Sequence, residues 1–156
     1  MADTNALFDT QIATFPGSYF GAYYQSFTID HADEKSASVF QVPQGCDLTG
    51  ATTYVSSVAS PPTYKYTLQS VSATGDPTGT VLATTAEFTP SSATKESHAF
   101  TSAYTASAGT ALALVVEYGS GTIGASNDAT FVDRQGTVKY HVLPFVLSRN
   151  DSGTWG

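Results

Sequence analysis

The sequence predicts an all-β protein, an antiparallel β-sandwich or jelly roll in which two sheets pack face to face. Runs of β-forming residues alternate with turn residues about nine or ten times along the chain. No segment shows a convincing helical period, so the crossover helices that a parallel α/β sheet requires are missing. A third observation is the turn around Gly75, Asp76, Pro77 and Gly79, a cluster that no helix tolerates.

The expected strands combine alternating apolar and polar positions with β-branched or aromatic residues. Residues 63–72 give the cleanest alternation, which is typical of a strand with one buried face. Residues 110–118 are apolar on both faces, so we expect this strand to lie in the centre of a sheet. The full set of expected strands is 23–29, 36–42, 48–58, 63–72, 80–89, 97–104, 110–118, 129–132 and 137–148.

The chain length of 156 residues fits one domain with two extensions. Residues 1–21 show no clean period, and Pro16 with Gly17 ends any helical turn before them, so we expect an extended N-terminal arm. Residues 22–149 form the predicted sandwich. Residues 150–156 read as a loop-like C-terminal tail.

The two extensions carry the predicted binding residues, which would contact a capsid surface or a neighbouring subunit. The arm holds several aromatic rings, which are too many to remain exposed to water without a partner. The tail holds the only tryptophan. The predicted interface residues are Phe8, Phe15, Tyr19, Phe20 and Trp155.

Charge narrows the expected partners. The formal net charge is −7, and charged residues make up only 12% of the chain. No basic patch exists to neutralise phosphates, so we expect no nucleic-acid binding. We also expect no membrane association, because no run of about 18 apolar residues could span a bilayer. No signal peptide follows Met1, so we expect a complete product made in the cytoplasm.

No catalytic motif stands out, and we expect neither an enzyme nor a cofactor. Cys46 is the only cysteine, which excludes an intrachain disulfide, and we expect it to be a small apolar residue near a strand start. No serine lies in a Gly-x-Ser-x-Gly setting. Paired carboxylates remain open because such a pair is spatial, and Glu87 and Glu117 are the main ones within strands.

Two further features leave alternatives open. Asp30, His31, Asp33 and Glu34 could offer oxygen ligands to Ca²⁺, but the motif is weak and a solvated acidic turn is the favoured interpretation, with no metal expected. The three histidines have no metal-ligand spacing. Most of the tyrosines fall on predicted strands, where we expect core packing. A flat exposed row of them could instead stack on sugar rings or contact a subunit.

Five segments carry a resemblance that covers about residues 24–118. They are YQSFT at 24–28, LTGA at 48–51, YKYTLQ at 64–69, GDPTGTVLA at 75–83 and AGTALALVV at 108–116. Together they resemble a β-sandwich module of tailed-phage virion proteins and of carbohydrate-binding parts of bacterial surface proteins.

The resemblance implies a function in the virion, after synthesis in the host cytoplasm. A sandwich of this size is similar to capsid decoration proteins, which bind the major capsid protein, often as homotrimers, and cement neighbouring capsomers. The expected function is therefore a non-enzymatic head decoration protein. The alternatives are a glycan-binding module and a tail or baseplate component that mediates attachment to the host surface.

Overall fold

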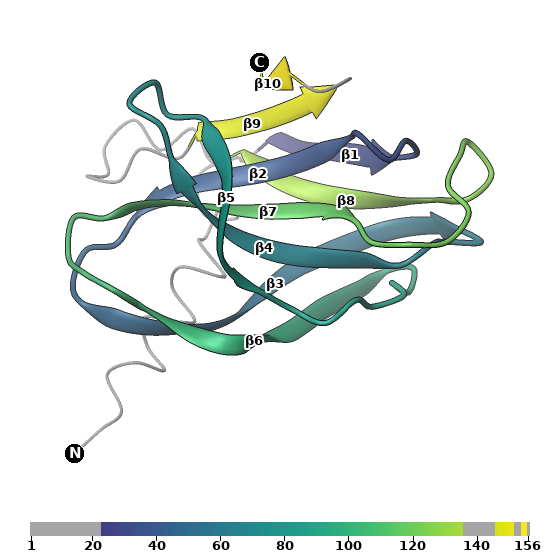
Figure 1. Cartoon of the computed structure of the whole chain (residues 1–156). Helices are drawn as coiled ribbons and strands as arrows, with labels where there is room; N and C mark the ends of the chain where they lie inside the picture. The colour runs from purple at the N-terminus through teal and green to yellow at the C-terminus, as the bar shows by residue number, and fades with distance from the viewer. Residues whose placement is uncertain (1–22, 136–145, 152–153, 156) are drawn as a thin grey trace.

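The computed structural model describes residues 23–135, 146–151 and 154–155, and this part of the chain consists of β-strands and the turns and loops that join them. It holds no helix that could cross a membrane. Figure 1 shows the strands in two layers. They are β1 (Tyr23–Ile29), β2 (Lys35–Gln41), β3 (Cys46–Ala59), β4 (Tyr64–Val71), β5 (Pro77–Thr84), β6 (Thr94–Ala106), β7 (Ala111–Tyr118), β8 (Asp128–Gln135), β9 (Val146–Asp151) and β10 (Thr154–Trp155).

Every strand pairing is antiparallel, and the strands form two sheets. The four-stranded sheet has the order β1-β8-β3-β6, and the six-stranded sheet has the order β10-β9-β2-β7-β4-β5. The predicted antiparallel β-sandwich is confirmed. The strand expected to be central is also confirmed, because β7 lies between β2 and β4.

The core fills the space between the sheets with side chains from alternate strand positions. Tyr64 and Tyr66 of β4 are fully buried, so the expected core packing of these two rings is confirmed. The Tyr64 ring meets Phe131 of β8 edge-on at 5.2 Å, and its hydroxyl donates to the Ile29 carbonyl at 2.9 Å. Both contacts join one sheet to the other, and the hydrogen bond satisfies a polar group that burial would otherwise penalise.

A second, smaller cluster lies on the outer face of the six-stranded sheet. Small side chains of β2 and β7 form it, and Val71 and Trp155 pack against it while partly exposed. In Figure 1 the chain at the β4–β5 turn crosses in front of β7 and β2, which agrees with Val71 at the end of β4 contacting this cluster. The outer cluster consists of Ala37, Val39, Ala113 and Val115.

Most strands begin or end one to three residues away from the sequence prediction. A larger difference is at the end of β5, which stops at Thr84 instead of residue 89 and leaves Glu87 outside the strand. β5 begins at Pro77, three residues earlier than expected, and the turn is closed by the Ser72 N–H donating to the Asp76 carbonyl at 2.8 Å. A proline is accepted there because β5 is the edge strand, so one of its sides needs no ladder donor. The tail was expected to be loop-like, but Thr154 and Trp155 pair with β9 as β10.

Gly50 fixes the close approach of two strands in the four-stranded sheet. A Cβ at this position would lie 2.6 Å from the His98 carbonyl oxygen and 3.0 Å from the Ala99 Cα. The pairing of β3 with β6 shifts register between Leu48 and Gly50. The glycine therefore lets the bulged strand lie against its neighbour where any side chain would collide with backbone.

Candidate binding surfaces

The predicted interface residues fall in two places. Phe8, Phe15, Tyr19 and Phe20 lie outside the described residues. Trp155 lies in β10 and is partly buried against the outer cluster of its own six-stranded sheet. Its backbone pairs with Asn150 of β9. Part of the Trp155 surface stays exposed. Its contact with a neighbouring subunit or a capsid surface stays a prediction.

The outer face of the four-stranded sheet presents an exposed tyrosine beside a lysine. Tyr54 of β3 is 42% exposed, and its register partner on β6 is the exposed Lys95. Register partners point to the same face of a sheet. Within the described part of the chain, neither the Tyr54 hydroxyl nor the Lys95 ammonium has a hydrogen-bond or ion-pair partner.

Hydroxyl groups lie next to this pair along β3 and β6, and on the other side of β3 the register partner of Tyr54 is Val132 of β8. Thr52 and Ser97 are the next register pair on the same face, and their hydroxyls share a hydrogen bond of 2.8 Å. Farther across the same sheet, the Thr28 hydroxyl of β1 and the Thr130 hydroxyl of β8 share another of 2.9 Å. We name Thr52, Tyr54, Lys95 and Ser97 the Tyr54 face. Its only charged member is Lys95.

The other two lysines among the described residues, Lys35 and Lys65, lie on the six-stranded sheet and form ion pairs. Lys35 donates to the Glu117 carboxylate at 2.6 Å, and Lys65 approaches its second oxygen at 3.7 Å. Glu117 is 8% exposed, so burial makes this carboxylate depend on its two cations. Glu117 is therefore occupied as a structural ion-pair partner, and Lys95 differs from both lysines in having no such neighbour.

The acidic turn between β1 and β2 is held together by its own backbone. The Glu34 carboxylate accepts the N–H groups of Asp30 at 2.8 Å and His31 at 3.0 Å. Burial raises the pKa of Glu34, and the negative charge of Asp30 adds to the rise. Burial also raises the pKa of Asp128, again with a contribution from Asp30. Over the residues that are described, no three His, Cys, Asp or Glu side chains are placed to hold a metal ion.

Glu87 was expected within a strand, but it lies beyond the end of β5, where it closes a loop. Its Oε2 atom accepts hydrogen bonds of 2.6 Å from the hydroxyls of both Thr63 and Ser120. The Ser120 and Thr63 donors hold the pKa of Glu87 below its ordinary value. Gly119 makes room for this arrangement, because a Cβ there would lie 2.8 Å from the Glu87 Cδ atom. Glu87 and Glu117 thus each engage a separate set of donors.

His98 of β6 packs within a group of aromatic rings. Its ring stacks on Phe88 with centroids 3.9 Å apart, and Tyr66 lies 5.9 Å away. Its Nε2 atom lies 3.1 Å from the Glu96 carboxylate. These contacts assign His98 a packing role between core rings and the largely buried carboxylate of Glu96.

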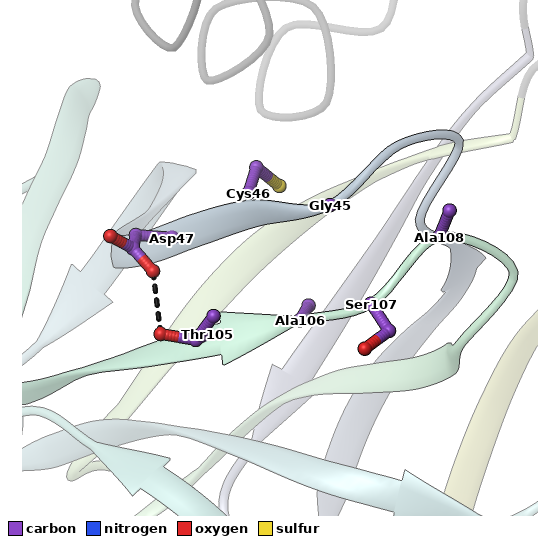
Figure 2. Close-up of a pocket in the computed structure, with 7 residues that line it drawn as sticks. All are labelled: Gly45, Cys46, Asp47, Thr105, Ala106, Ser107 and Ala108. Atoms are coloured by element: carbon purple, nitrogen blue, oxygen red, sulfur yellow. Dashed lines mark hydrogen bonds between the residues drawn. The ribbon is translucent and has the colours of Figure 1, made fainter.

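A shallow hollow lies where β3 begins and β6 ends, as Figure 2 shows. Its volume is about 550 Å³, and its walls are small or polar. The Thr105 hydroxyl donates to Asp47 at 2.6 Å across the two strands. Cys46 opens β3 and packs partly buried against the core, which confirms the expected small apolar role near a strand start. The walls are Gly45, Cys46, Asp47, Thr105, Ala106, Ser107 and Ala108.

Sequence reasoning placed Tyr54 on a strand and Lys95 in a loop, so it missed their pairing. Alternation along β3 puts Tyr54 on the face opposite the fully buried Val55, and this local signal was readable. The register with β6 was not, because it depends on the shift at Gly50.

Comparisons of the chain with protein-family models, curated proteins and solved structures found no match.

Proposed function

We propose that the protein is a non-enzymatic structural protein of a phage virion, a head decoration protein that binds the major capsid protein as a homotrimer. The observation that carries this proposal is Trp155, the only tryptophan of the chain, which packs against the outer cluster and keeps part of its surface exposed. Protein contact surfaces are enriched in aromatic residues and depleted of charged residues, and charged residues make up only 12% of this chain. The five sequence segments that resemble virion sandwich modules support the same assignment.

Binding energy alone performs this function. Apolar burial supplies about 25 cal/mol per Å² before the costs of association are subtracted. A stable contact buries at least about 1,000 Å² in total. The aromatic residues of the arm, Phe8, Phe15, Tyr19 and Phe20, would supply the most apolar surface per residue. The exposed part of Trp155 would add to it at the other end of the chain.

Deletion of residues 1–20 tests the assignment of the interface. We expect the shortened chain to lose binding to purified phage heads in a co-sedimentation assay, because it lacks the aromatic anchors. Its β-sandwich should still unfold cooperatively, since the core lies within residues 27–131. Binding equal to that of the full chain would show that the arm is not the interface.

The number of copies per particle separates the proposed function from its alternative in the tail or baseplate. A head decoration protein is present in hundreds of copies, whereas a tail part is present in a few. Quantitative mass spectrometry of purified virions measures this number directly. A count of a few copies would overturn the head assignment.

A further inference from the structure

We propose that the Tyr54 face binds a carboxylated saccharide, with the sugar ring stacked on Tyr54 and its carboxylate held by Lys95. This inference concerns the isolated protein and does not depend on capsid binding. Tyr54 and Lys95 are exposed register partners on one face of the four-stranded sheet, and neither side chain has a hydrogen-bond or ion-pair partner in the part of the chain that the structure describes.

The Tyr54 ring supplies the surface on which a sugar ring can stack. Tyr54 and Val81 are the large hydrophobic side chains that stand exposed among the described residues, and they belong to opposite sheets. An aromatic face carries a negative quadrupole that attracts the positively polarised C–H groups of a sugar ring. The Tyr54 side chain is 42% exposed, so part of its ring is open to such stacking.

Lys95 supplies a positive charge beside the Tyr54 ring. The chain has 13 acidic and 6 basic residues, so a cation without a carboxylate neighbour is unusual here. Lys35 and Lys65 both pair with Glu117, whereas the neighbours of Lys95 on its face carry hydroxyls or the phenol of Tyr54. The following residue, Glu96, accepts from the Ser91 N–H and from His98 instead. The free ammonium therefore complements an anionic group of the ligand.

The spacing of the side chains on the Tyr54 face matches the size of one sugar ring. Register partners in an antiparallel pair lie about 4.5–5.5 Å apart, and alternate residues on one strand lie about 6.6–6.8 Å apart. Tyr54, Lys95, Thr52 and Ser97 thus span about one pyranose ring with a substituent. The two hydroxyls that border the ring can donate to or accept from sugar hydroxyls.

The same features favour a saccharide over an acidic protein as the occupant. A protein interface needs a wide apolar centre that excludes water, and the Tyr54 face has one exposed ring, with the hydroxyls of Thr52 and Ser97 beside it and Val132 as its register partner on β8. A single sugar needs only the ring, the cation and a few hydroxyls. Such a site has few contacts, so we expect dissociation constants in the millimolar range for one short oligosaccharide.

A nuclear magnetic resonance titration of the isotope-labelled full chain tests the proposal. The probe is a galacturonate trisaccharide, and the comparison probes are a neutral galactose trisaccharide and a glutamate tripeptide. At about 150 mM salt, where charges are screened beyond about 8 Å, we expect the galacturonate to bind at least about tenfold more tightly than either comparison probe. The shifted amides should map to β3 and β6, which locates the site without any variant.

Matched variants separate the two proposed contacts from general charge effects. Tyr54→Ala and Lys95→Gln should each weaken galacturonate binding by about tenfold. Lys65→Gln removes the same charge from the opposite sheet, and Val81→Ala removes the other exposed apolar side chain, so both should bind as the unaltered chain does. Unchanged binding in Tyr54→Ala or Lys95→Gln would overturn the proposal. Equal binding of the glutamate tripeptide, or shifts that map elsewhere, would also overturn it.

Discussion

Burial and hydrogen bonding shift the pKa values of carboxyl groups in this protein in opposite directions. Glu87 is exposed, and two hydroxyl donors lower its pKa. Asp128 has no compensating donors of this kind, and burial beside Asp30 raises its pKa. An acid with a raised pKa is penalised when it is ionised, so Asp128 reduces stability at neutral pH.

The substitution Asp128→Asn should therefore stabilise the protein in a pH-dependent manner. A raised pKa in the folded state means that the folded protein retains the proton longer than the unfolded chain as pH rises. Stability is then lost between the ordinary pKa, about 3.9, and the higher folded value. We expect the variant to melt at a higher temperature than the unaltered chain at pH 7 and at the same temperature near pH 3.

Calorimetry at both pH values measures this difference. Asp76→Asn in the exposed β4–β5 turn is the control, since it also removes one negative charge but lies far from Asp30 along the chain. A variant that melts alike at pH 7 would contradict the assigned cause of the pKa shift.

At the scale of strands, backbone approach matters as much as side-chain burial. β3 pairs with both β6 and β8, and each pairing contains a register shift. Gly50 lies at the shift that faces β6, where the neighbouring atoms belong to the backbone and cannot rotate away. The strand therefore tolerates sequence change unequally along its length.

Gly50→Ala should destabilise the protein by about 1–3 kcal/mol, the range for overpacking. Gly45→Ala is a matched control, because a Cβ at Gly45 would meet the Ala106 carbonyl oxygen at an ordinary 3.5 Å. Urea unfolding followed by circular dichroism gives both free energies. Equal effects of the two substitutions would show that the close contact at Gly50 relaxes without cost.

The whole molecule depends on contacts that join its two sheets and its C-terminus. Trp155 covers part of the outer cluster, whose members belong to the central strands β2 and β7. Detaching the C-terminal β9–β10 hairpin would expose apolar side chains of the centre of the larger sheet. The hairpin should therefore stay attached until the entire sandwich unfolds.

The single tryptophan makes this expectation measurable. We expect the urea transition seen by Trp155 fluorescence to coincide with the transition seen by far-ultraviolet circular dichroism, as two-state unfolding requires. Trp155→Phe, which keeps an aromatic ring, should retain most of the stability that Trp155→Ala loses. A fluorescence transition at lower urea than the dichroism transition would show that the hairpin opens on its own.

Much of the fold was predictable from the sequence, because strand alternation and turn residues are local signals. Residues 23–29 and β1 agree at both ends, and the two-sided apolar pattern of residues 110–118 placed β7 in the centre. The Tyr54 face was not predictable as a site, since it depends on pairing between strands about 40 residues apart. Trp155 was expected in a loop because two residues of strand carry too little pattern to detect.

The proline that opens β5 has a consequence for crowding. An open sheet edge offers unpaired backbone groups to any chain that meets it, and such encounters lead to fibrous aggregates. Pro77 lacks an N–H to offer, and the two register shifts beside it bend the ladder away from a straight template. The larger sheet thus ends in a strand that resists joining the sheet of another molecule, even when many copies are packed close together.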